Sequence, residues 1–272
     1  MKTWMITGGT RGFGAAVARE ALARGDRVAI TGRDKAACAA ISDSDRALPV
    51  ALDMTKAEDI ARAVAEVQDW AGGIDVLFNN AGRGHHGAIE EVSDAEAKAL
   101  FELNVFGLLD LTRQVLPGMR AARKGHIINV GSIAGMTGNP GSGIYSATKF
   151  AVAGITEAMA AELAPLGIGV TLLAPGPFRT DFNGGSLTRS AAVIDDYAGT
   201  AHKRIAALRE TDGQQKGDPL KLATLVCDIA GTDSPPLHLF VGSPAVDRAR
   251  AKLAEIAQDI DAWEGQSRAT DY

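Results

Sequence analysis

Short apolar runs alternate with longer amphipathic stretches along most of the chain. Most of the short runs lack a polar residue at every second position, which is the pattern of strands buried on both faces of a sheet. The runs predicted as strands are residues 3–7, 27–31, 47–52, 74–79, 126–130, 169–174 and 237–241. The stretches predicted as helices are residues 14–24, 56–70, 93–123, 145–166 and 219–230.

Strands that alternate with helices form βαβ units, and these build an open parallel sheet with helices on both faces. Seven strands at this spacing use almost the whole chain, so we predict one Rossmann-type, doubly wound α/β domain over residues 1–272. Residues 181–217 break the rhythm with several Gly, Ser, Thr and Asp and only a weak helical pattern at 195–209. We predict a substrate loop or lid there. Residues 244–272 are predicted to form a helix as far as residue 263, followed by a polar tail.

Composition narrows the possible partners. Of 272 residues, 28 are Lys or Arg and 33 are Asp or Glu, which gives a net charge of −5 and argues against nucleic-acid and anionic-membrane partners. The first residues lack the apolar stretch of a signal peptide, and no segment approaches the ~20 apolar residues of a membrane span, so we expect a cytoplasmic protein. The two cysteines, Cys38 and Cys227, have no metal-ligand spacing and are expected to be reduced and buried.

A glycine-rich turn lies between the first predicted strand and the first predicted helix. Its sequence is Thr7-Gly8-Gly9-Thr10-Arg11-Gly12-Phe13-Gly14, spaced Gly-x-x-x-Gly-x-Gly rather than as the common Gly-x-Gly-x-x-Gly fingerprint. Free N–H groups at a helix start bind phosphate, and glycine lets the backbone come close to it. The turn predicts a site for the pyrophosphate of a dinucleotide, although ordinary strand–helix turns also use glycine.

The end of the second predicted strand bears on the choice between NAD and NADP. An NAD site usually places a carboxylate there, on the ribose 2′-hydroxyl. Gly32 takes that place here, and Arg33 follows it. Arg33 together with Arg11 suits a 2′-phosphate, because a guanidinium is a planar and permanently charged set of donors. We expect NADP(H); the alternatives are NAD held by Asp34, or arginines that are only solvated.

Tyr145 and Lys149 occupy positions i and i+4 on one face of a predicted helix. A free tyrosine has a pKa near 10, and a nearby ammonium favours the phenolate and lowers that pKa. The phenol could then donate a proton to a carbonyl or accept one from an alcohol. An isolated Tyr-x-x-x-Lys is more often a half-buried tyrosine beside a surface lysine.

Two further polar residues give this pair a context. Ser132 follows the fifth predicted strand, at the edge where open α/β sheets bind ligands, and its hydroxyl could stabilise charge on a substrate oxygen. Asn104 interrupts an apolar helical face, where an unpaired amide is costly. Its side chain either pairs with a local carbonyl, or its backbone carbonyl holds a water that links Lys149 to solvent.

Over residues 1 to about 180 the sequence closely resembles the short-chain dehydrogenase/reductase family. The resemblance rests on the glycine turn, Asp53, the sequence Asn79-Asn80-Ala81-Gly82, Asn104, Ser132, Tyr145, Lys149 and Pro175-Gly176. The C-terminal third is similar in layout to a subgroup often labelled retinol- or 17β-hydroxysteroid-dehydrogenase-like. Gly9, Thr10 and Gly131 are minor departures from the family's usual residues.

The resemblance implies a role for each of these residues. Tyr145 would be the general acid/base, Lys149 would lower its pKa and bind the nicotinamide ribose, Ser132 would polarise the substrate carbonyl, and Asn104 would complete a proton relay. The implied cofactor-binding residues are Gly8, Thr10, Arg11, Gly12, Phe13, Gly14, Arg33, Asp53, Met54, Asn80, Ala81, Gly82, Tyr145, Lys149, Pro175, Gly176, Phe178 and Thr180. Asp53 and the backbone of Met54 would meet the adenine, and residues 175–180 the nicotinamide carboxamide.

Other residues are candidates for the substrate pocket. His85 and His86 either line it or are solvated, and they lack a third ligand at metal spacing, so no metal is expected. Residues 138–143 are predicted to form another wall. Phe178, Phe182 and Tyr197 are expected to be apolar contacts if the weak helix folds over the substrate, and Trp263 is expected to be a packing anchor.

These observations predict an oxidoreductase that transfers a hydride between NADP(H) and a small carbonyl or secondary-alcohol substrate, with reduction dominant. One alternative is a non-catalytic dinucleotide-binding regulator on the same fold, which loss of the tyrosine or lysine would favour. Another is a nucleotide-sugar epimerase or dehydratase, whose separate substrate region does not fit in this length. The resemblance also implies a homodimer or homotetramer paired through residues 93–123 and 145–166.

Overall fold

A seven-stranded parallel sheet forms the centre of the molecule. The computed structural model describes residues 1–182 and 187–272. The strand order is β3-β2-β1-β4-β6-β7-β9, and every neighbouring pair is parallel, which confirms the Rossmann-type sheet. All seven predicted strands are present: β1 (Thr3–Ile6), β2 (Arg27–Gly32), β3 (Ala47–Ala51), β4 (Val76–Asn79), β6 (Gly125–Val130), β7 (Ile168–Pro175) and β9 (His238–Val241).

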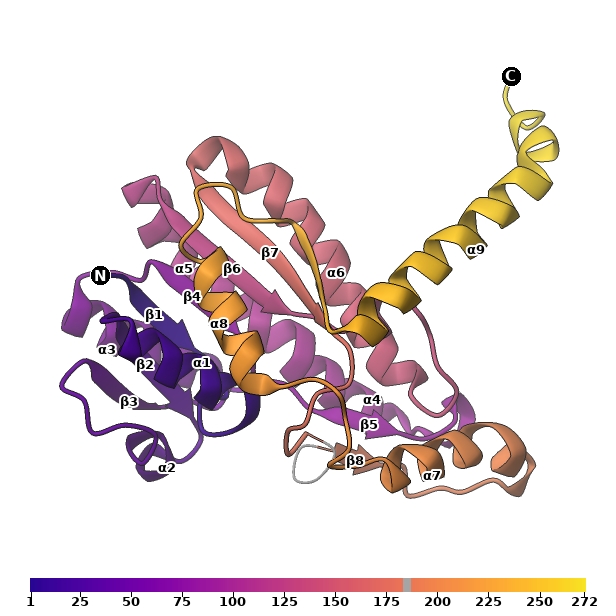
Figure 1. Ribbon diagram of the computed structural model, residues 1–272, viewed down its shortest axis with the longest axis horizontal. Coiled ribbons are helices and arrows are strands. Elements are labelled where there is room, and N and C mark those ends of the chain that lie inside the picture. The colour runs from indigo at the N-terminus through magenta and orange to yellow at the C-terminus, as the bar shows by residue number, and fades with distance from the viewer. Residues whose placement is uncertain (183–186) are drawn as a thin grey trace.

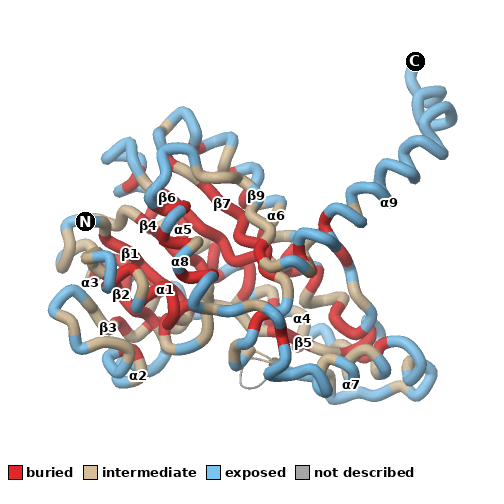
Figure 2. The backbone as a smooth tube through the Cα atoms, viewed as in Figure 1, coloured by how far each residue is buried: buried red, intermediate tan, exposed pale blue. Residues whose placement is uncertain are grey.

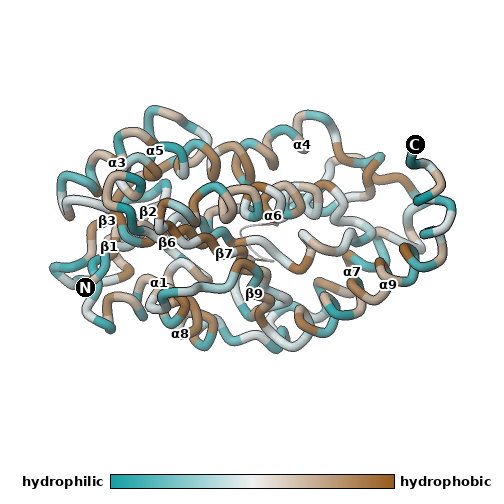
Figure 3. The backbone as a smooth tube through the Cα atoms, turned by 90° about the horizontal axis from the view of Figure 1, so that it is seen from above, coloured by the Kyte–Doolittle hydropathy of each residue, from teal (hydrophilic) through white to brown (hydrophobic). Residues whose placement is uncertain are grey.

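Helices cover both faces of this sheet (Figures 1 and 3). On one face α1 (Gly12–Ala23) packs against α8 (Pro219–Ile229). The opposite face carries α3 (Ala57–Ala71), α5 (Gly107–Ala122) and α6 (Gly143–Leu163). The predicted single helix over residues 93–123 is α4 (Asp94–Phe101) and α5 joined by one π-helical turn, Glu102–Phe106.

The strands lack polar alternation because side chains pointing either way are buried (Figure 2). In β1, Trp4 and Ile6 belong to the core on the α1 and α8 side, while Met5 belongs to the core on the α3, α5 and α6 side. Both cysteines are buried and free, as predicted.

The strand order reverses between β1 and β4. The chain runs outward through β1, β2 and β3, and then returns to build β4, β6, β7 and β9 on the other side of β1. Ligands bind at such a switch point, beyond the carboxyl ends of the strands. The glycine turn leaves β1 there, and the Asn80 turn leaves β4 beside it.

Several elements were not predicted. Asp34 caps the short helix α2 (Lys35–Ala39), and 3₁₀ turns occur at Ile89–Glu91, Ile133–Gly135 and Ala164–Leu166. A second, two-stranded parallel sheet joins β5 (Gly84–His86) to β8 (Leu187–Arg189).

Most of the predicted insertion at 181–217 can be placed in the fold, and its residues 183–186 lie outside the described residues. The weak helical pattern at 195–209 is a continuous helical run, composed of a 3₁₀ turn (Asp195–Tyr197), a π turn (Ala198–His202) and α7 (Lys203–Glu210). This run lies beside β5 and the loop at 138–143, because Gly141 packs against Ile205 and the Ala201 carbonyl.

The last helix, α9 (Ser243–Arg268), is longer than the predicted one and projects away from the body of the molecule (Figure 1). The prediction for Trp263 is wrong: its side chain is 64% exposed and anchors no packing against the residues that the structure describes. In the part of the chain that the structure describes, no helix has the length and apolar character needed to cross a membrane.

Candidate active site

Ser132 and Tyr145 meet beyond the carboxyl end of β6. Ser132 lies two residues after this strand and begins the 3₁₀ turn, where its hydroxyl oxygen accepts a hydrogen bond of 3.0 Å from the N–H of Ala134. Tyr145 lies in the first turn of α6, and its hydroxyl lies close enough to the Ser132 side chain for Ser132 to act on its pKa. The Ile133–Gly135 turn can pack tightly on α6 because Gly135 has no side chain to strike the carbonyl of Lys149.

Lys149 is buried one helical turn after Tyr145. Its Nζ donates a hydrogen bond of 2.7 Å to the carbonyl of Val130, at the end of β6. The same atom lies 5.9 Å from the centroid of the Tyr145 ring. Burial lowers the pKa of Lys149 to about 8, so the ammonium is charged at neutral pH but deprotonates not far above it.

The pKa of Tyr145 is shifted in the direction opposite to the expected one. Burial raises the pKa of Tyr145 to about 12, and the interaction with the Ser132 side chain acts in the opposite direction without cancelling it. Lys149 is not among the causes of this shift, so the lowering expected from it does not occur in this arrangement, where desolvation dominates. The ring of Phe182 adds to this burial, at 6.0 Å between centroids. A phenol in this state keeps its proton at neutral pH and is suited to donate it.

Asn104 is fully satisfied through its side chain, and its partners are distant in sequence. Its Oδ1 accepts a 3.0 Å hydrogen bond from the N–H of Arg83, and its Nδ2 donates to the Arg83 carbonyl at 3.0 Å and to the Thr148 hydroxyl at 3.2 Å. Thr148 in turn donates to the carbonyl of Tyr145. Gly82 permits this approach, since a Cβ there would lie 3.1 Å from the Asn104 oxygen. The predicted pairing with a local carbonyl is replaced by this cross-link.

The π turn that contains Asn104 bears on its other proposed role. The N–H of Gly107 bonds back to the carbonyl of Glu102, five residues earlier, instead of four as in an α-helix. Such a turn shifts the ladder of carbonyls by one residue, a feature often found at functional sites. That the Asn104 carbonyl holds a water stays a prediction.

The glycine turn is braced from the neighbouring strand. The side-chain amide of Asn80 donates to the carbonyls of Thr7 and Gly8 at 2.8 and 3.1 Å. The Thr7 hydroxyl accepts from the N–H groups of Asn80 and Ala81, both at 2.9 Å. Asn80 and Ala81 thus hold the turn from behind. A Cβ on Gly14 would strike the carbonyl of Gly8, so glycine is required there.

The start of α1 has the features of a phosphate site. Gly8 and Gly12 have φ of 61° and 54°, a region that favours glycine. The residue before the helix, Arg11, provides no side-chain hydrogen bond to the helix start. The first N–H groups of α1 are therefore not engaged by a cap, and they suit the oxygens of a pyrophosphate.

Residues after β7 close over this turn. A Cβ on Gly12 would lie 3.6 Å from Thr180, and Phe13 meets Phe178 edge to face at 5.2 Å between centroids. Phe178 is thus a packing partner of the glycine turn, and its expected contact with substrate stays a prediction. Pro175 and Gly176 are held at the end of β7 by a 3.0 Å bond from the Gly176 N–H to the Val241 carbonyl.

Thr10, Arg33 and Asp53 gather at the other side of the turn. A Cβ on Gly32 would lie 3.0 Å from Thr10. Arg33 is exposed, and its charge is one of the lesser causes that lower the pKa of Asp53, the largest being a hydrogen bond from the Thr55 N–H. The Asp34 carboxylate instead accepts hydrogen bonds from the N–H groups of Ala36 and Ala37 and so caps α2.

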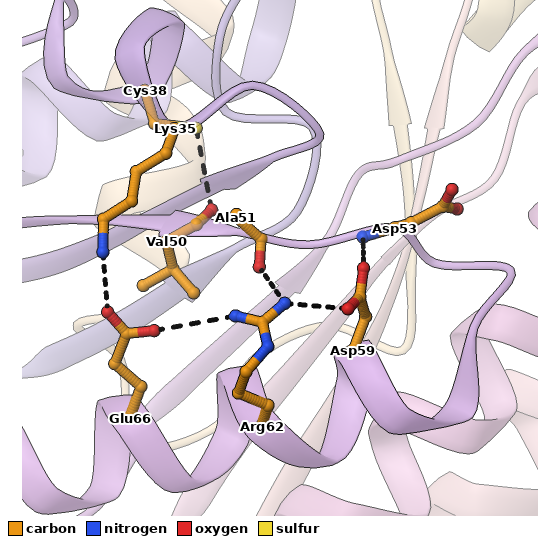
Figure 4. A network of polar contacts seen from close by, with 8 residues as sticks. All are labelled: Lys35, Cys38, Val50, Ala51, Asp53, Asp59, Arg62 and Glu66. Atoms are coloured by element: carbon orange, nitrogen blue, oxygen red, sulfur yellow. Dashed lines mark hydrogen bonds and ion pairs between the residues drawn. The ribbon is translucent and has the colours of Figure 1, made fainter.

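A polar network fixes the segment from which Asp53 projects (Figure 4). Arg62 donates to the Ala51 carbonyl at 3.1 Å and to the Asp59 carboxylate at 2.9 Å, and the other oxygen of Asp59 accepts the N–H of Asp53. Glu66 continues the network to Lys35 and Arg62. The Asp53 carboxylate points away from it (Figure 4). Met54 is buried, with its carbonyl tight against Gly107.

Of three residues considered for the substrate pocket, His85 and Tyr197 are hydrogen-bonded within the protein and His86 is half-buried. His85 is neither solvated nor free for a ligand: its ring nitrogens pair with the hydroxyls of Thr188 and Ser190 at 2.9 and 3.2 Å, which ties β5 to β8. His86 is half-buried, and burial lowers its pKa to about 4, so it is neutral. Tyr197 donates to the carboxylate of Glu90 at 2.6 Å, and the expected apolar contact is replaced by this rim hydrogen bond.

Arg83, Val130 and Thr148 are positioning residues that sequence reasoning missed. Arg83 and Val130 act through backbone groups, which carry no signature in the sequence. Thr148 lies between Tyr145 and Lys149, and a hydroxyl at that position was the one available signal.

Residues 2–190 match the family model described as short chain dehydrogenase. An oxidoreductase of Botryotinia fuckeliana, BOA17, is 36% identical over 263 residues, 96% of this chain and 95% of that protein. A 3-ketodihydrosphingosine reductase of Bacteroides thetaiotaomicron is 34% identical over 239 residues, 88% of this chain and 87% of that protein.

Solved structures extend the likeness to the whole chain. A short-chain dehydrogenase from Streptomyces avermitilis has a TM-score of 0.93 and 38% identity, and covers 100% of both chains. A 3-ketoacyl-(acyl-carrier-protein) reductase from Brucella melitensis, complexed with NADH, has a TM-score of 0.74 and 29% identity over 88% of this chain and 96% of its own. The protein ElxO, with NADP bound, has a TM-score of 0.75 and 26% identity over 91% of this chain and 100% of its own.

Proposed function

Because the chain belongs to the short-chain dehydrogenase/reductase family, a family of oxidoreductases, we propose that it is an NADP(H)-dependent carbonyl reductase. The observation that carries this proposal is the arrangement beyond the carboxyl end of β6, where the buried phenol of Tyr145 lies beside Ser132 and the Lys149 Nζ is 5.9 Å from the centroid of its ring. A group that holds its proton at pH 7 fits the acid needed to reduce a carbonyl better than the base needed to oxidise an alcohol.

The residues present fit the nucleotide. The uncapped start of α1 and the positive φ of Gly8 and Gly12 leave N–H groups for the pyrophosphate. Arg33 stands where a 2′-phosphate would be recognised, with Arg11 in the adjoining turn, whereas the Asp34 carboxylate that an NAD site would need is a helix cap. Asp53 and Met54 are proposed for the adenine, Asn80, Ala81 and Gly82 for the ribose side, and Pro175, Gly176, Phe178 and Thr180 for the nicotinamide amide.

When bound, the reduced nicotinamide supplies the hydride that becomes the new C–H bond of the alcohol. The Tyr145 hydroxyl donates its proton to the carbonyl oxygen as that oxygen gains charge. Ser132 stabilises the same oxygen through a hydrogen bond that strengthens in the transition state. The Lys149 ammonium stabilises the phenolate that Tyr145 becomes, and Asn104 holds the helix turn that presents Tyr145. The phenolate then recovers a proton from water.

The residues around Tyr145 bear on the substrate class, and exposed apolar residues on the helices bear on the assembly. We propose a small ketone or aldehyde bounded by Phe182, the loop at 138–143 and the described insertion residues 187–217. The exposed side chains of Phe106 and Phe150 suit the proposed pairing of copies through α4, α5 and α6.

Tyr145→Phe tests the proposal, because it removes one oxygen and keeps the packing with Phe182. We expect carbonyl-dependent oxidation of NADPH to fall at least about 100-fold, within the usual contribution of general acid catalysis. NADPH affinity should stay within about twofold, measured by fluorescence titration. Unchanged turnover in Tyr145→Phe, over a panel of ketones and aldehydes that wild type reduces, would contradict Tyr145 as the acid. Failure of the wild-type chain to bind either nucleotide would contradict the enzyme itself.

A further inference from the structure

The projecting part of α9 carries an apolar stripe that no element among the described residues covers. Leu253, Ile256, Ile260 and Trp263 are 58%, 41%, 59% and 64% exposed, and Figure 2 shows the helix exposed along most of its length. Side chains of this size in one row on a helix are the mark of a helix that packs against a partner.

The spacing of the stripe is that of a coiled coil. From Val246 the apolar positions advance by three and four residues in turn, through Ala249, Leu253, Ile256 and Ile260 to Trp263. This is the a and d pattern of a heptad repeat. The repeat starts where the helix is anchored, because Ala245 and Ala249 are buried and Arg248 donates to Thr137 and Asn139. Beyond that base the seam continues without a covering element.

A helix in this position gains little stability alone. In proteins most of the stability of a helix comes from packing of its amphipathic face, so the projecting turns would be stabilised by a second surface. Apart from the base of α9, the exposed stripe faces no element of the described chain (Figure 1). Because two copies would present the same row of large apolar residues to each other, the stripe is self-complementary.

Charges beside the seam select the orientation of the partner. In the first half Arg250 and Lys252 flank the seam, and in the second half Asp259 and Glu264 do so. A parallel second copy would place Asp259 against the partner's Glu264, which is a repulsive g-to-e contact. An antiparallel copy reverses this and brings each basic half alongside an acidic half.

We propose that α9 pairs with α9 of a second copy of this chain, antiparallel, through Leu253, Ile256, Ile260 and Trp263. The contact is isologous, so each favourable charge contact occurs twice. Lys252 of one copy faces the partner's Asp259. Within one copy these two residues are about 10 Å apart along the helix axis, which is too far for a direct ion pair. Lys252 reaches Glu255 in its own helix, at 2.8 Å.

Sedimentation velocity of the full-length chain tests the pairing. The double variant Ile256→Asp/Ile260→Asp is expected to have half the mass of wild type at micromolar concentration. Both substituted positions are already exposed, so far-UV circular dichroism and NADPH affinity should stay close to wild type. Equal masses for variant and wild type would overturn the proposal. If wild type shows the α9 contact but binds no nucleotide, the proposed function fails while this inference stands.

Charge exchange tests the orientation. Lys252→Glu and Asp259→Lys are each expected to weaken the α9-dependent association about tenfold, since two attractive contacts become repulsive. Combined in one chain, they should restore it to within about threefold. Asp261→Lys makes the same change of charge on the outer side of the helix and should have little effect. A double variant as weak as the singles would overturn the antiparallel arrangement, because the lost Glu255 pair is not recovered by the second substitution.

Discussion

The side-chain amide of Asn104 donates a hydrogen bond to the hydroxyl of Thr148, although the two residues are 44 positions apart. The same side chain binds both backbone groups of Arg83, and Thr148 binds the carbonyl of Tyr145. Asn104 therefore joins the loop after β4 to the first turn of α6. The position of the proposed acid depends on a residue that is not in contact with its hydroxyl.

Replacing Asn104 with Ala should lower both stability and turnover. The change leaves the Arg83 N–H and carbonyl without their partner, which we expect to cost about 2 kcal/mol in the free energy of unfolding. We expect kcat for ketone reduction to fall at least about tenfold through misplacement of Tyr145. Urea unfolding and steady-state kinetics measure the two effects. Thr148→Val, which breaks only the link to α6, should lose activity with less loss of stability; wild-type kcat in both variants would contradict the positioning role.

Asn104 also shows how far the sequence could predict the site. A polar residue on an apolar helical face marked it as unusual, and the family motifs indicated its neighbours. Its bonds to Arg83 and Thr148 could not be predicted, because backbone partners have no sequence signature and a π turn changes the helical register by one residue. The seven strands were predictable for the opposite reason, since burial on both faces leaves a continuous apolar run in each.

The pKa of Lys149 predicts the alkaline limb of the activity profile. With a pKa near 8, the ammonium loses its charge as the pH rises through that value, and the phenolate form of Tyr145 loses its stabilising neighbour. We expect kcat/KM for reduction to be level from pH 6 to about 7.5 and to decline above pH 8. In Lys149→Arg, whose guanidinium stays charged, that decline should move beyond pH 9 even if the maximum rate is lower. An unmoved limb in the Arg variant would assign it to another group.

Arg33 provides the test of cofactor choice. Removing its guanidinium in Arg33→Ala should weaken NADPH binding by about 1.5–3 kcal/mol, the usual value of a hydrogen bond to a charged group. NADH, which has no 2′-phosphate, should bind almost as before. Arg46→Ala is the matched control, because that arginine precedes β3 and so lies at the amino ends of the strands, whereas Arg33 follows the carboxyl end of β2. If NADH binds wild type more tightly and Arg33→Ala is silent, the cofactor is NAD.

The parts of the pocket formed by the insertion were the least predictable. His85 looks like a loop residue in the sequence, but β8, whose Thr188 is 103 positions later, pairs with β5 and buries His85 against Thr188. Tyr197 was expected to be an apolar contact and instead donates to Glu90. The prediction for Trp263 was wrong for a related reason. A large apolar residue indicates that a surface covers it, but the sequence does not show which surface.

The buried carboxylate of Glu91 is predicted to hold the insertion in place. This carboxylate is only 3% exposed and accepts the N–H groups of Ala88 and Ile194 and the His202 ring, at 2.7, 2.8 and 2.6 Å. In Glu91→Gln one acceptor oxygen becomes a donor facing other donors, so residues 194–202 should loosen. We expect faster hydrogen exchange in that segment and a raised KM for the carbonyl, with NADPH affinity unchanged. The exposed variant Glu210→Gln, at the end of α7, makes the same change of charge and should alter neither; equal effects in both would point to general surface charge.

His126 predicts an acid-sensitive component of stability. The side chain is 6% exposed, pairs with the Thr171 hydroxyl at 2.9 Å, and has a pKa lowered by burial from 6.5 to about 4. Between these values the unfolded chain binds a proton that the folded chain refuses, so stability falls as the pH drops from 6.5 toward 4. At pH 4.5 this amounts to about 2 kcal/mol. His126→Asn removes the titration, and its loss of stability between pH 7 and 4.5 should be smaller than that of wild type by about this amount. Parallel pH curves for the two proteins, measured by urea unfolding, would show that His126 is protonated in the folded state.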